Sequence, residues 1–251
     1  MGITTEIAWC YATWNPWQGC NKTSAGCKFC YMFREMKRYG KHPAYVFRSA
    51  KATFNAPLRW ARTGKLPPGA RIFVCSWSDF WHKDADPWRE EAFDIMRQTP
   101  QFTYLIPTKR TERIAYHLPH DWGQGWPNVW LGASIENQSY ANKRTIELLS
   151  VPAAVHFWSA EPLLEAVLVP DLSGLPYKLD WIIVGGESGP EHRPFEVEWA
   201  RTLRDQARKI GAAFFMKQFG GWPNKQGDIQ DFPADLQIRE FPSSPQAELW
   251  R

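Results

Sequence analysis

The fold is decided by the stretch Val129-Trp130-Leu131-Gly132-Ala133-Ser134, which is followed by a helical pattern at 138–149 and an apolar run at 154–159. Both apolar runs have the length of a strand, and neither shows the strict alternation of a sheet with one wet face. Such runs are typical of strands that are buried on both faces. A helix that joins two strands of this kind makes them parallel, so the stretch predicts one β-α-β unit.

The same rhythm continues on both sides of this unit. We predict strands at residues 6–14, 71–76, 102–106, 129–134, 154–159, 181–184 and 212–216, and helices at 31–39, 49–62, 88–98, 108–117, 138–149 and 197–210. This order fits an open doubly wound sheet or a partial or full (β/α) TIM-type barrel of about six to seven parallel strands. No G-x-G-x-x-G follows the first strand, which weakens a dinucleotide-binding interpretation.

The length of 251 residues and the hydrophobic content of 44% suit one large α/β domain. We expect a single (β/α) domain over residues 1–217, and a Gly/Pro-rich C-terminal extension over 218–251 that covers the barrel or is partly loose. The first residues lack a signal-peptide pattern, and no apolar stretch approaches the ~18 residues of a membrane span. We therefore expect a cytoplasmic protein with no membrane partner.

Three of the five cysteines, Cys20, Cys27 and Cys30, lie close together with the spacing C-x6-C-x2-C. In an intracellular protein, such clustering points more often to metal or redox chemistry than to disulfides. An iron–sulfur cluster is one interpretation, and a closed zinc site completed by Cys10 or His82 is the other. We favour iron–sulfur, because an α/β domain with its own core has little need of a structural zinc ion.

Polar residues follow the predicted strands. Ser76 and Asp79 come after the strand at 71–76, and Ser134 and Glu136 come at the end of the strand at 129–134. Any one of them could simply cap a helix. In both architectures, however, the carboxyl ends of the strands gather at one edge, so the whole set predicts a polar pocket there.

The strand at 181–184 is followed by Gly185-Gly186-Glu187. Paired glycines form tight turns with positive φ, or they let a ligand approach the backbone closely. The adjacent carboxylate favours binding, so we include all three residues among the candidate site residues.

Positive charge is concentrated in one segment. The formal net charge is only +4, but residues 28–71 hold eleven Lys and Arg against one Glu, with aromatic residues interleaved. This composition can belong to a solvated face, or it can bind a nucleic-acid backbone and stack on its bases. We take a nucleic acid as the candidate partner, contacted by Arg34, Lys37, Arg38, Lys41, Arg48 and Lys51.

The chain resembles a phage- and bacteria-associated family of radical-SAM-like proteins. The resemblance runs from about residue 6 to 221 and is carried by 13–20 (Thr-Trp-Asn-Pro-Trp-x-Gly-Cys), 26–31 (Gly-Cys-Lys-Phe-Cys-Tyr), 76–82, 130–137, 159–164, 183–190 and 214–220. The Cys27-to-Tyr31 motif is also similar to that of spore photoproduct lyase. The common superfamily spacing is C-x3-C-x2-C, and the longer first gap is shared by the family resembled here.

The resemblance implies a partial barrel whose three thiolates hold a [4Fe–4S] cluster, with one iron left open for S-adenosylmethionine. It implies that an external electron donor reduces the cluster, and that a 5′-deoxyadenosyl radical then abstracts hydrogen from the substrate. Phe29 and Tyr31 would lie beside the cofactor, and Ser76 and Asp79 would stand where the superfamily binds the methionine amino group. Ser134 and Glu136 would contact the ribose, and Gly185, Gly186 and Glu187 resemble the GGE stretch but come late in the chain.

Three functions remain open from the sequence. The first is a radical-SAM enzyme that acts on nucleic acid, in repair or modification. The second is a radical-SAM enzyme that acts on an anionic small molecule or peptide. The third is a non-enzymatic nucleic-acid-binding protein with a structural metal site.

Overall fold

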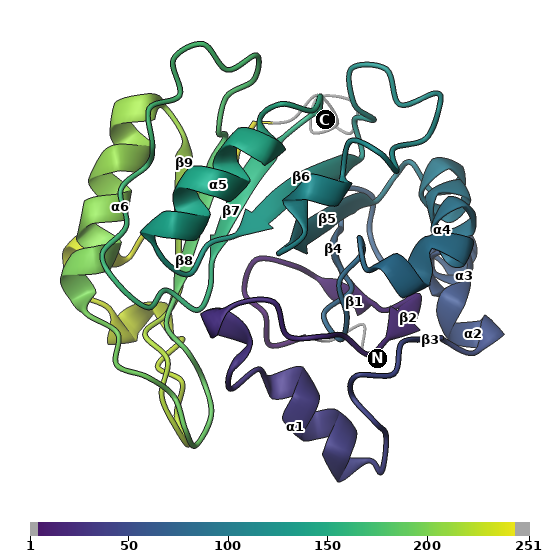
Figure 1. Cartoon of the computed structure of the whole chain (residues 1–251), viewed down its shortest axis with the longest axis horizontal. Coiled ribbons are helices and arrows are strands. Elements are labelled where there is room, and N and C mark those ends of the chain that lie inside the picture. Colours follow the sequence, from purple (N-terminus) through teal and green to yellow (C-terminus); the bar gives the residue numbers. More distant parts are fainter. Residues whose placement is uncertain (1–4, 244–251) are drawn as a thin grey trace.

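The computed structural model describes residues 5–243. Its seven-stranded sheet has the order β1 (Ala12–Trp14), β4 (Arg71–Val74), β5 (Thr103–Thr108), β6 (Val129–Ser134), β7 (His156–Ala160), β8 (Trp181–Gly185) and β9 (Ala213–Gln218). All neighbouring strands pair in parallel. Spatial order follows chain order, as in a (β/α) barrel, whereas a doubly wound sheet reverses its order at a switch point. The described sheet ends at β1 and β9 without closing, so the fold is a partial barrel (Figure 1).

Most of the helices lie on the outside of this curled sheet, and α1 (Tyr31–Arg38) is the exception (Figure 1). The other helices are α2 (Lys51–Phe54), α3 (Ala56–Thr63), α4 (Asp86–Gln98), α5 (Gln138–Leu148) and α6 (Val197–Ile210). Short 3₁₀ turns are η1 (Ala25–Cys27), η2 (Lys83–Ala85), η3 (Thr111–Arg113), η4 (Ile229–Asp231) and η5 (Ala234–Leu236). A two-stranded antiparallel ribbon joins β2 (Trp17–Gln18) to β3 (Phe47–Arg48). Helix α1 stands apart from the other helices, below the sheet in Figure 1.

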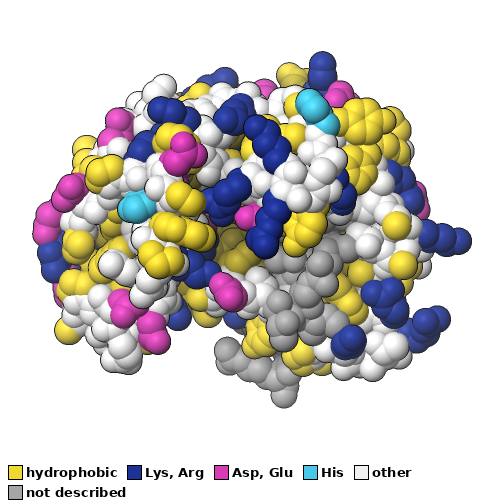
Figure 2. Space-filling model, turned by 90° about the horizontal axis from the view of Figure 1, so that it is seen from below, with side chains coloured by type: hydrophobic (Ala, Val, Ile, Leu, Met, Phe, Trp, Pro, Cys, Tyr) yellow, Lys and Arg dark blue, Asp and Glu magenta, His cyan; other side chains and the backbone are white. Residues whose placement is uncertain are grey.

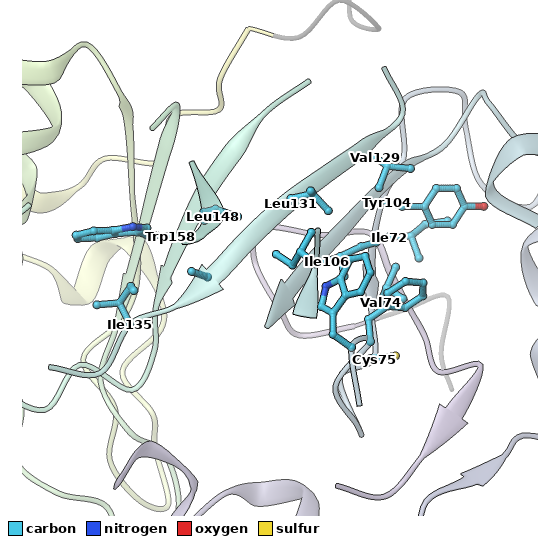
Figure 3. Packing of buried hydrophobic residues seen from close by; sticks show 14 of the residues in the cluster. Ile72, Val74, Cys75, Tyr104, Ile106, Val129, Leu131, Ile135, Leu148 and Trp158 are labelled. Atoms are coloured by element: carbon cyan, nitrogen blue, oxygen red, sulfur yellow. The ribbon is translucent and has the colours of Figure 1, made fainter. Parts of the chain in front are cut away.

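Alternate strand residues build two separate cores. Ile72 and Val74 of β4 belong to the cluster shared with the helices, where Figure 3 also shows Leu131 of β6 and Trp158 of β7. Phe73, between them, joins the second cluster, which contains no helix residue. That inner cluster is rich in large aromatic rings, so it fills the concave side of the sheet: Trp9, Trp130, Phe157, Trp181 and Phe215.

Several predicted elements were wrong in extent or kind. The predicted helix at 108–117 is absent: Thr108 is the last residue of β5, and only the short turn η3 follows. The strand at 6–14 is reduced to β1, because Cys10 N donates to Ile7 O in a turn (3.2 Å). The helix at 49–62 is interrupted at Asn55, with Pro57 in the first turn of α3. The helix expected at 88–98 begins two residues earlier, at Asp86, and has Pro in its first turn.

The C-terminal extension covers the barrel as far as it is described. Met216 N donates to Ile238 O, and Glu240 N donates to Phe214 O, both at 2.9 Å, so the extension runs along β9. Phe232 and Leu236 are buried in the helix-side core. Residues 244–251, the end of the predicted extension, lie outside the described residues. Between residues 5 and 243, no helix is both long and apolar enough to cross a membrane.

An aromatic contact between α4 and the loops beside it should stabilise the fold. The Phe93 ring is fully buried, with Phe80 at 5.2 Å and Trp126 at 5.7 Å between ring centroids. We expect Phe93→Ala to lower the free energy of unfolding by about 3–5 kcal/mol in urea titrations, because it leaves a large cavity. Tyr116→Ala removes a ring that is 84% exposed, so it should change the free energy by less than about 0.5 kcal/mol. Equal losses in the two variants would contradict this packing.

Candidate functional site

A cavity of about 580 Å³ lies at the carboxyl ends of the strands. All three cysteines of the C-x6-C-x2-C loop line it, together with seven of the other predicted site residues: Phe29, Tyr31, Ser76, Asp79, Ser134, Gly186 and Glu187. The predicted polar pocket at the strand ends is therefore present. Figure 2, which views the molecule from below, shows Lys and Arg side chains around a hollow on this face.

Close backbone contacts at Gly19 hold the cysteine loop next to the strand ends. Gly19 has φ +93°, and a Cβ there would lie 2.1 Å from Tyr45 O, so only glycine fits where the loop begins. Its N–H donates to Trp77 O at 3.0 Å. The turn η1 then carries Cys27, and α1 begins directly after Cys30. The loop thus places three thiols over the open end of the barrel.

Glu136 lies behind this loop, is fully buried, and is not part of the cavity lining. Its carboxylate accepts hydrogen bonds from Lys109 Nζ (2.5 Å), Arg144 Nη1 (2.6 Å) and the Ser24 hydroxyl. A Cβ on Gly26 would lie 2.4 Å from Glu136 Cγ, so the loop rests directly on this side chain. Burial raises the pKa of Glu136, but Lys109 and Arg144 outweigh it and the pKa is lowered. Its placement favours holding the cysteine loop over the ribose contact that the resemblance implies.

Asp79 is also buried, and it connects two strand ends to Cys20. Its carboxylate accepts from Thr108 Oγ1 (2.7 Å), Arg110 Nη1 (3.0 Å) and the backbone N–H groups of 81 and 109. Arg110 in turn donates to Cys20 Sγ at 3.5 Å and to Asn21 O at 3.0 Å. With so many donors already bound, Asp79 acts on the cysteine loop through Arg110.

The three thiols have different acidities. Burial raises the pKa of Cys20 to about 12, and burial also raises the pKa of Cys30. Burial opposes ionisation of Cys27 too, but Lys109 and hydrogen bonds from 23 and 24 prevail, so the pKa of Cys27 is lowered. Cys27 is therefore the thiol that most readily becomes a thiolate, the form that binds metals.

The Gly185-Gly186-Glu187 stretch has a structural explanation. Neither glycine has positive φ, which excludes the alternative of a tight turn that requires it. A Cβ on Gly186 would lie 1.9 Å from Phe219 O, and one on Gly185 would lie 2.7 Å from Glu161 Oε1. The close approach is therefore made by the chain itself. Glu187 lines the cavity and is paired with Arg193, whose guanidinium lies over the Phe29 ring, 5.3 Å from its centroid.

Three further predicted site residues, Phe29, Tyr31 and Ser134, also line the cavity. Phe29 is half-buried between Lys28 and Arg193. The Tyr31 hydroxyl donates to Ser76 O at 2.6 Å, which fixes α1 to the end of β4. Ser134, the last residue of β6, is partly exposed to the cavity.

Neither metal interpretation finds a preformed ligand set. Among residues 5–243, no three His, Cys, Asp or Glu side chains stand close enough together to hold a metal ion, and this includes Cys20, Cys27 and Cys30. Cys10 is buried in the inner core, and His82 Nε2 lies 2.8 Å from Asn21 Oδ1. Cys75, directly after β4, is buried, has φ +63° and also lines the cavity.

The predicted nucleic-acid residues are spread over α1, the segment after it, β3 and α2, and Lys41 contacts the β2–β3 ribbon through Gln18 and the Phe47 ring. On α1 and just after it, Arg34, Lys37, Arg38 and Lys41 are exposed, with Tyr39 and Tyr45 64% and 68% exposed nearby in the chain. Arg48 instead pairs with Glu91 at 2.5 Å and stacks on the Phe54 ring at 3.7 Å. Lys51 begins α2, which Figure 1 places to the side, away from α1.

Lys109 and Arg110 stand at the end of a predicted strand but were not among the candidate site residues. They follow β5 directly, where a helix was predicted, and they reach the cysteine loop through Glu136 and Cys20. Glu161 and Lys217 also line the cavity and pair at 2.5 Å. All four residues lie at or directly after the end of an apolar strand. This position could have identified them as site residues from the sequence, because the strand ends converge on this edge of the sheet.

Asp79→Asn tests the connection to Cys20. We expect the variant to lose about 3 kcal/mol of unfolding free energy at pH 7, because Arg110 keeps its buried charge without a partner. The pKa of Asp79 is lowered in the folded protein. The stability that the ionised Asp79 side chain contributes is therefore complete above about pH 4, and it is lost as the pH falls through the lowered pKa. In urea titrations the difference from wild type should therefore shrink in acid, and a difference that grows in acid would contradict the assignment. Asp84→Asn, at a half-exposed carboxylate, is the matched control and should have little effect.

A family model described as "Protein of unknown function (DUF5131)" matches residues 4–244. A search of curated proteins and a search of solved structures gave no match. Because the family model covers nearly the whole chain, including the cysteine loop and all seven strands, the protein belongs to the DUF5131 family.

Proposed function

We propose that this protein is a radical S-adenosylmethionine enzyme whose [4Fe–4S] cluster is held by Cys20, Cys27 and Cys30. The observation that carries the proposal is that all three thiols line one cavity at the carboxyl ends of a parallel partial barrel. Catalytic sites of (β/α) barrels lie at this end. The family that the sequence motifs resemble implies the same arrangement, with three thiols after the first strand of a partial barrel.

The donor set suits a cluster with one open position. The loop carries three cysteines, so one iron of a four-iron cluster would have no thiolate ligand. A fourth thiolate would occupy that coordination position. With S-adenosylmethionine and an external electron donor, such a cluster supplies a carbon-centred radical that abstracts hydrogen. Lys109 favours the thiolate form of Cys27, and Arg110 donates to Cys20, so the protein compensates the negative charge that the ligands bring.

The other cavity residues fit the binding of S-adenosylmethionine. Phe29 presents an aromatic ring for the adenine, flanked by two cations. Four acidic side chains and four basic ones line the cavity, which suits a ligand that carries both an amino and a carboxylate group: Glu6, Asp79, Glu161, Glu187, Lys109, Arg110, Lys217 and Lys225. The inner aromatic core below the cavity keeps water from entering through the barrel.

The decisive test is anaerobic reconstitution with iron and sulfide, followed by S-adenosylmethionine and dithionite. We expect a brown protein with about four irons per chain, and formation of 5′-deoxyadenosine by mass spectrometry. Cys20→Ala, Cys27→Ala and Cys30→Ala should each abolish colour and product, while circular dichroism shows a folded barrel. Cys10→Ala, in a buried thiol outside the cavity lining, is the matched control and should retain both. A colourless wild type that contains stoichiometric zinc would overturn the proposal.

We further propose that the substrate is a group within a nucleic acid, and that this nucleic acid contacts α1. Lys37 and Arg38 are exposed at the end of this helix, next to the exposed Tyr39 ring, and Trp222 is 58% exposed. Arg34 links the two features, because its guanidinium lies 5.9 Å from the Trp222 ring centroid. Cations bind phosphates and aromatic rings stack on bases, and both are present beside the cysteine loop.

Charge reversal on α1 tests this surface. We expect Lys37→Glu combined with Arg38→Glu to weaken binding of a labelled single-stranded DNA about tenfold or more in fluorescence anisotropy, with a shallower salt dependence. Lys65→Glu combined with Lys209→Glu makes the same change of charge at two exposed lysines that precede β4 and β9, near the amino ends of the strands. This control should bind within about twofold of wild type. Binding that is unchanged by the α1 variant would exclude this helix as the contact.

A further inference from the structure

A second cavity, of about 310 Å³, lies beside the cysteine cavity. Nine residues line it, of which six are cations and one is an acid: Thr23, Lys83, Lys109, Arg110, Glu112, Arg113, Tyr140, Lys143 and Arg144. We refer to it as the cationic pocket. The cysteine cavity, by contrast, has equal numbers of acidic and basic side chains. The cationic pocket is therefore the electropositive one of the two.

The carboxylates that balance the inner cations lie behind the pocket wall. Lys109 and Arg144 bind Glu136, Arg110 binds Asp79, and none of these carboxylates lines the pocket. Arg113 binds Asp86, which is likewise outside the lining. These carboxylates, together with backbone carbonyls that accept from Arg110, Arg113 and Arg144, hold the cations in place at the pocket wall. A pre-oriented set of donors binds an anion without ordering its own side chains first.

Two further cations stand at the mouth without strong partners. Lys83 makes no ion pair with any of residues 5–243, and Lys143 has Glu147 at 4.0 Å as its ion partner. Lys143 is 61% exposed. Positive charge that the protein does not neutralise itself attracts an anion from solution.

The pocket shares a wall with the cysteine cavity. Lys109 and Arg110 line both. Thr23, at the edge of the cationic pocket, has its hydroxyl 3.8 Å from Cys27 Sγ. A ligand group held in the cationic pocket would therefore lie next to the three thiols, in position to anchor a substrate whose reacting part enters the cysteine cavity.

We propose that the cationic pocket binds a phosphate group of the substrate. Guanidinium groups pair with phosphate through two parallel N–H donors, and lysine adds point charge, so the several acceptor oxygens of a tetrahedral phosphate group satisfy this set better than one carboxylate does. The volume suits one or two phosphate groups rather than a whole nucleotide strand. The source of the phosphate is a phosphodiester of the nucleic acid, and this part of the inference rests on the proposed function.

The test uses the metal-free protein, so that its outcome is independent of cluster chemistry. Lys83→Glu combined with Lys143→Glu reverses the two exposed charges and leaves the buried ion pairs intact. We expect this variant to bind inorganic pyrophosphate at least about tenfold more weakly in isothermal titration calorimetry, and to bind the labelled single-stranded DNA correspondingly more weakly. Lys65→Glu combined with Lys209→Glu should match wild type with both probes.

The two probes distinguish the sources of the phosphate. Loss of affinity for both supports a phosphodiester in the pocket, and loss for pyrophosphate alone supports a small phosphorylated substrate. Unchanged pyrophosphate binding in the Lys83/Lys143 variant, or an equal loss in the control, overturns the inference. If the wild type binds both probes but forms no 5′-deoxyadenosine after reconstitution, the radical-enzyme proposal fails and the phosphate site stands.

Discussion

The site depends on one buried carboxylate. Glu136 reaches from the end of β6 to the cysteine loop, where it accepts the Ser24 hydroxyl and fills the space that Gly26 leaves open. Such a group is costly to bury unless its charge is compensated, and Lys109 and Arg144 provide that compensation. Because Lys109 follows β5 and Arg144 belongs to α5, one ion-pair network connects the loop to two neighbouring β/α units. This network supports the loop at Ser24 and Gly26, before Cys27, whereas Cys20 is held through Arg110 and Asp79.

The same network explains why the two cavities have different electrostatic character. Lys109 and Arg110 leave β5 side by side, and each is bound to a carboxylate from a neighbouring strand end. In the cysteine cavity, Lys109 and Arg110 share the lining with thiols and acidic side chains. In the cationic pocket, the same two residues lie among further cations. A single pair of side chains thus separates a balanced cavity from an electropositive one.

Local patterns in the sequence were sufficient for the parallel sheet but left two architectures open, and they did not give the contacts within the site. Strands β5 to β9 were predictable because each is a short apolar run that is mostly buried, and the polar residues after the strands marked the cavity. The helix expected at 108–117 was wrong because Lys109 and Arg110 are held by Glu136 and Asp79, partners that no local pattern identifies. The contact between Ser24 and Glu136 spans 112 residues of sequence. Gly185 and Gly186 show the reverse case, since a motif suggestive of a ligand is explained by chain packing.

An open barrel leaves two edge strands, and exposed strand edges pair readily with other molecules. The two edges are treated differently here. β1 has only three residues, so it offers a short template. β9 has six residues, and the segment around Arg239 lies antiparallel along it, where a strand from another copy would otherwise add. The C-terminal extension therefore guards against self-association as well as covering the core, and a chain shortened before residue 238 would present a long, apolar edge prone to aggregation.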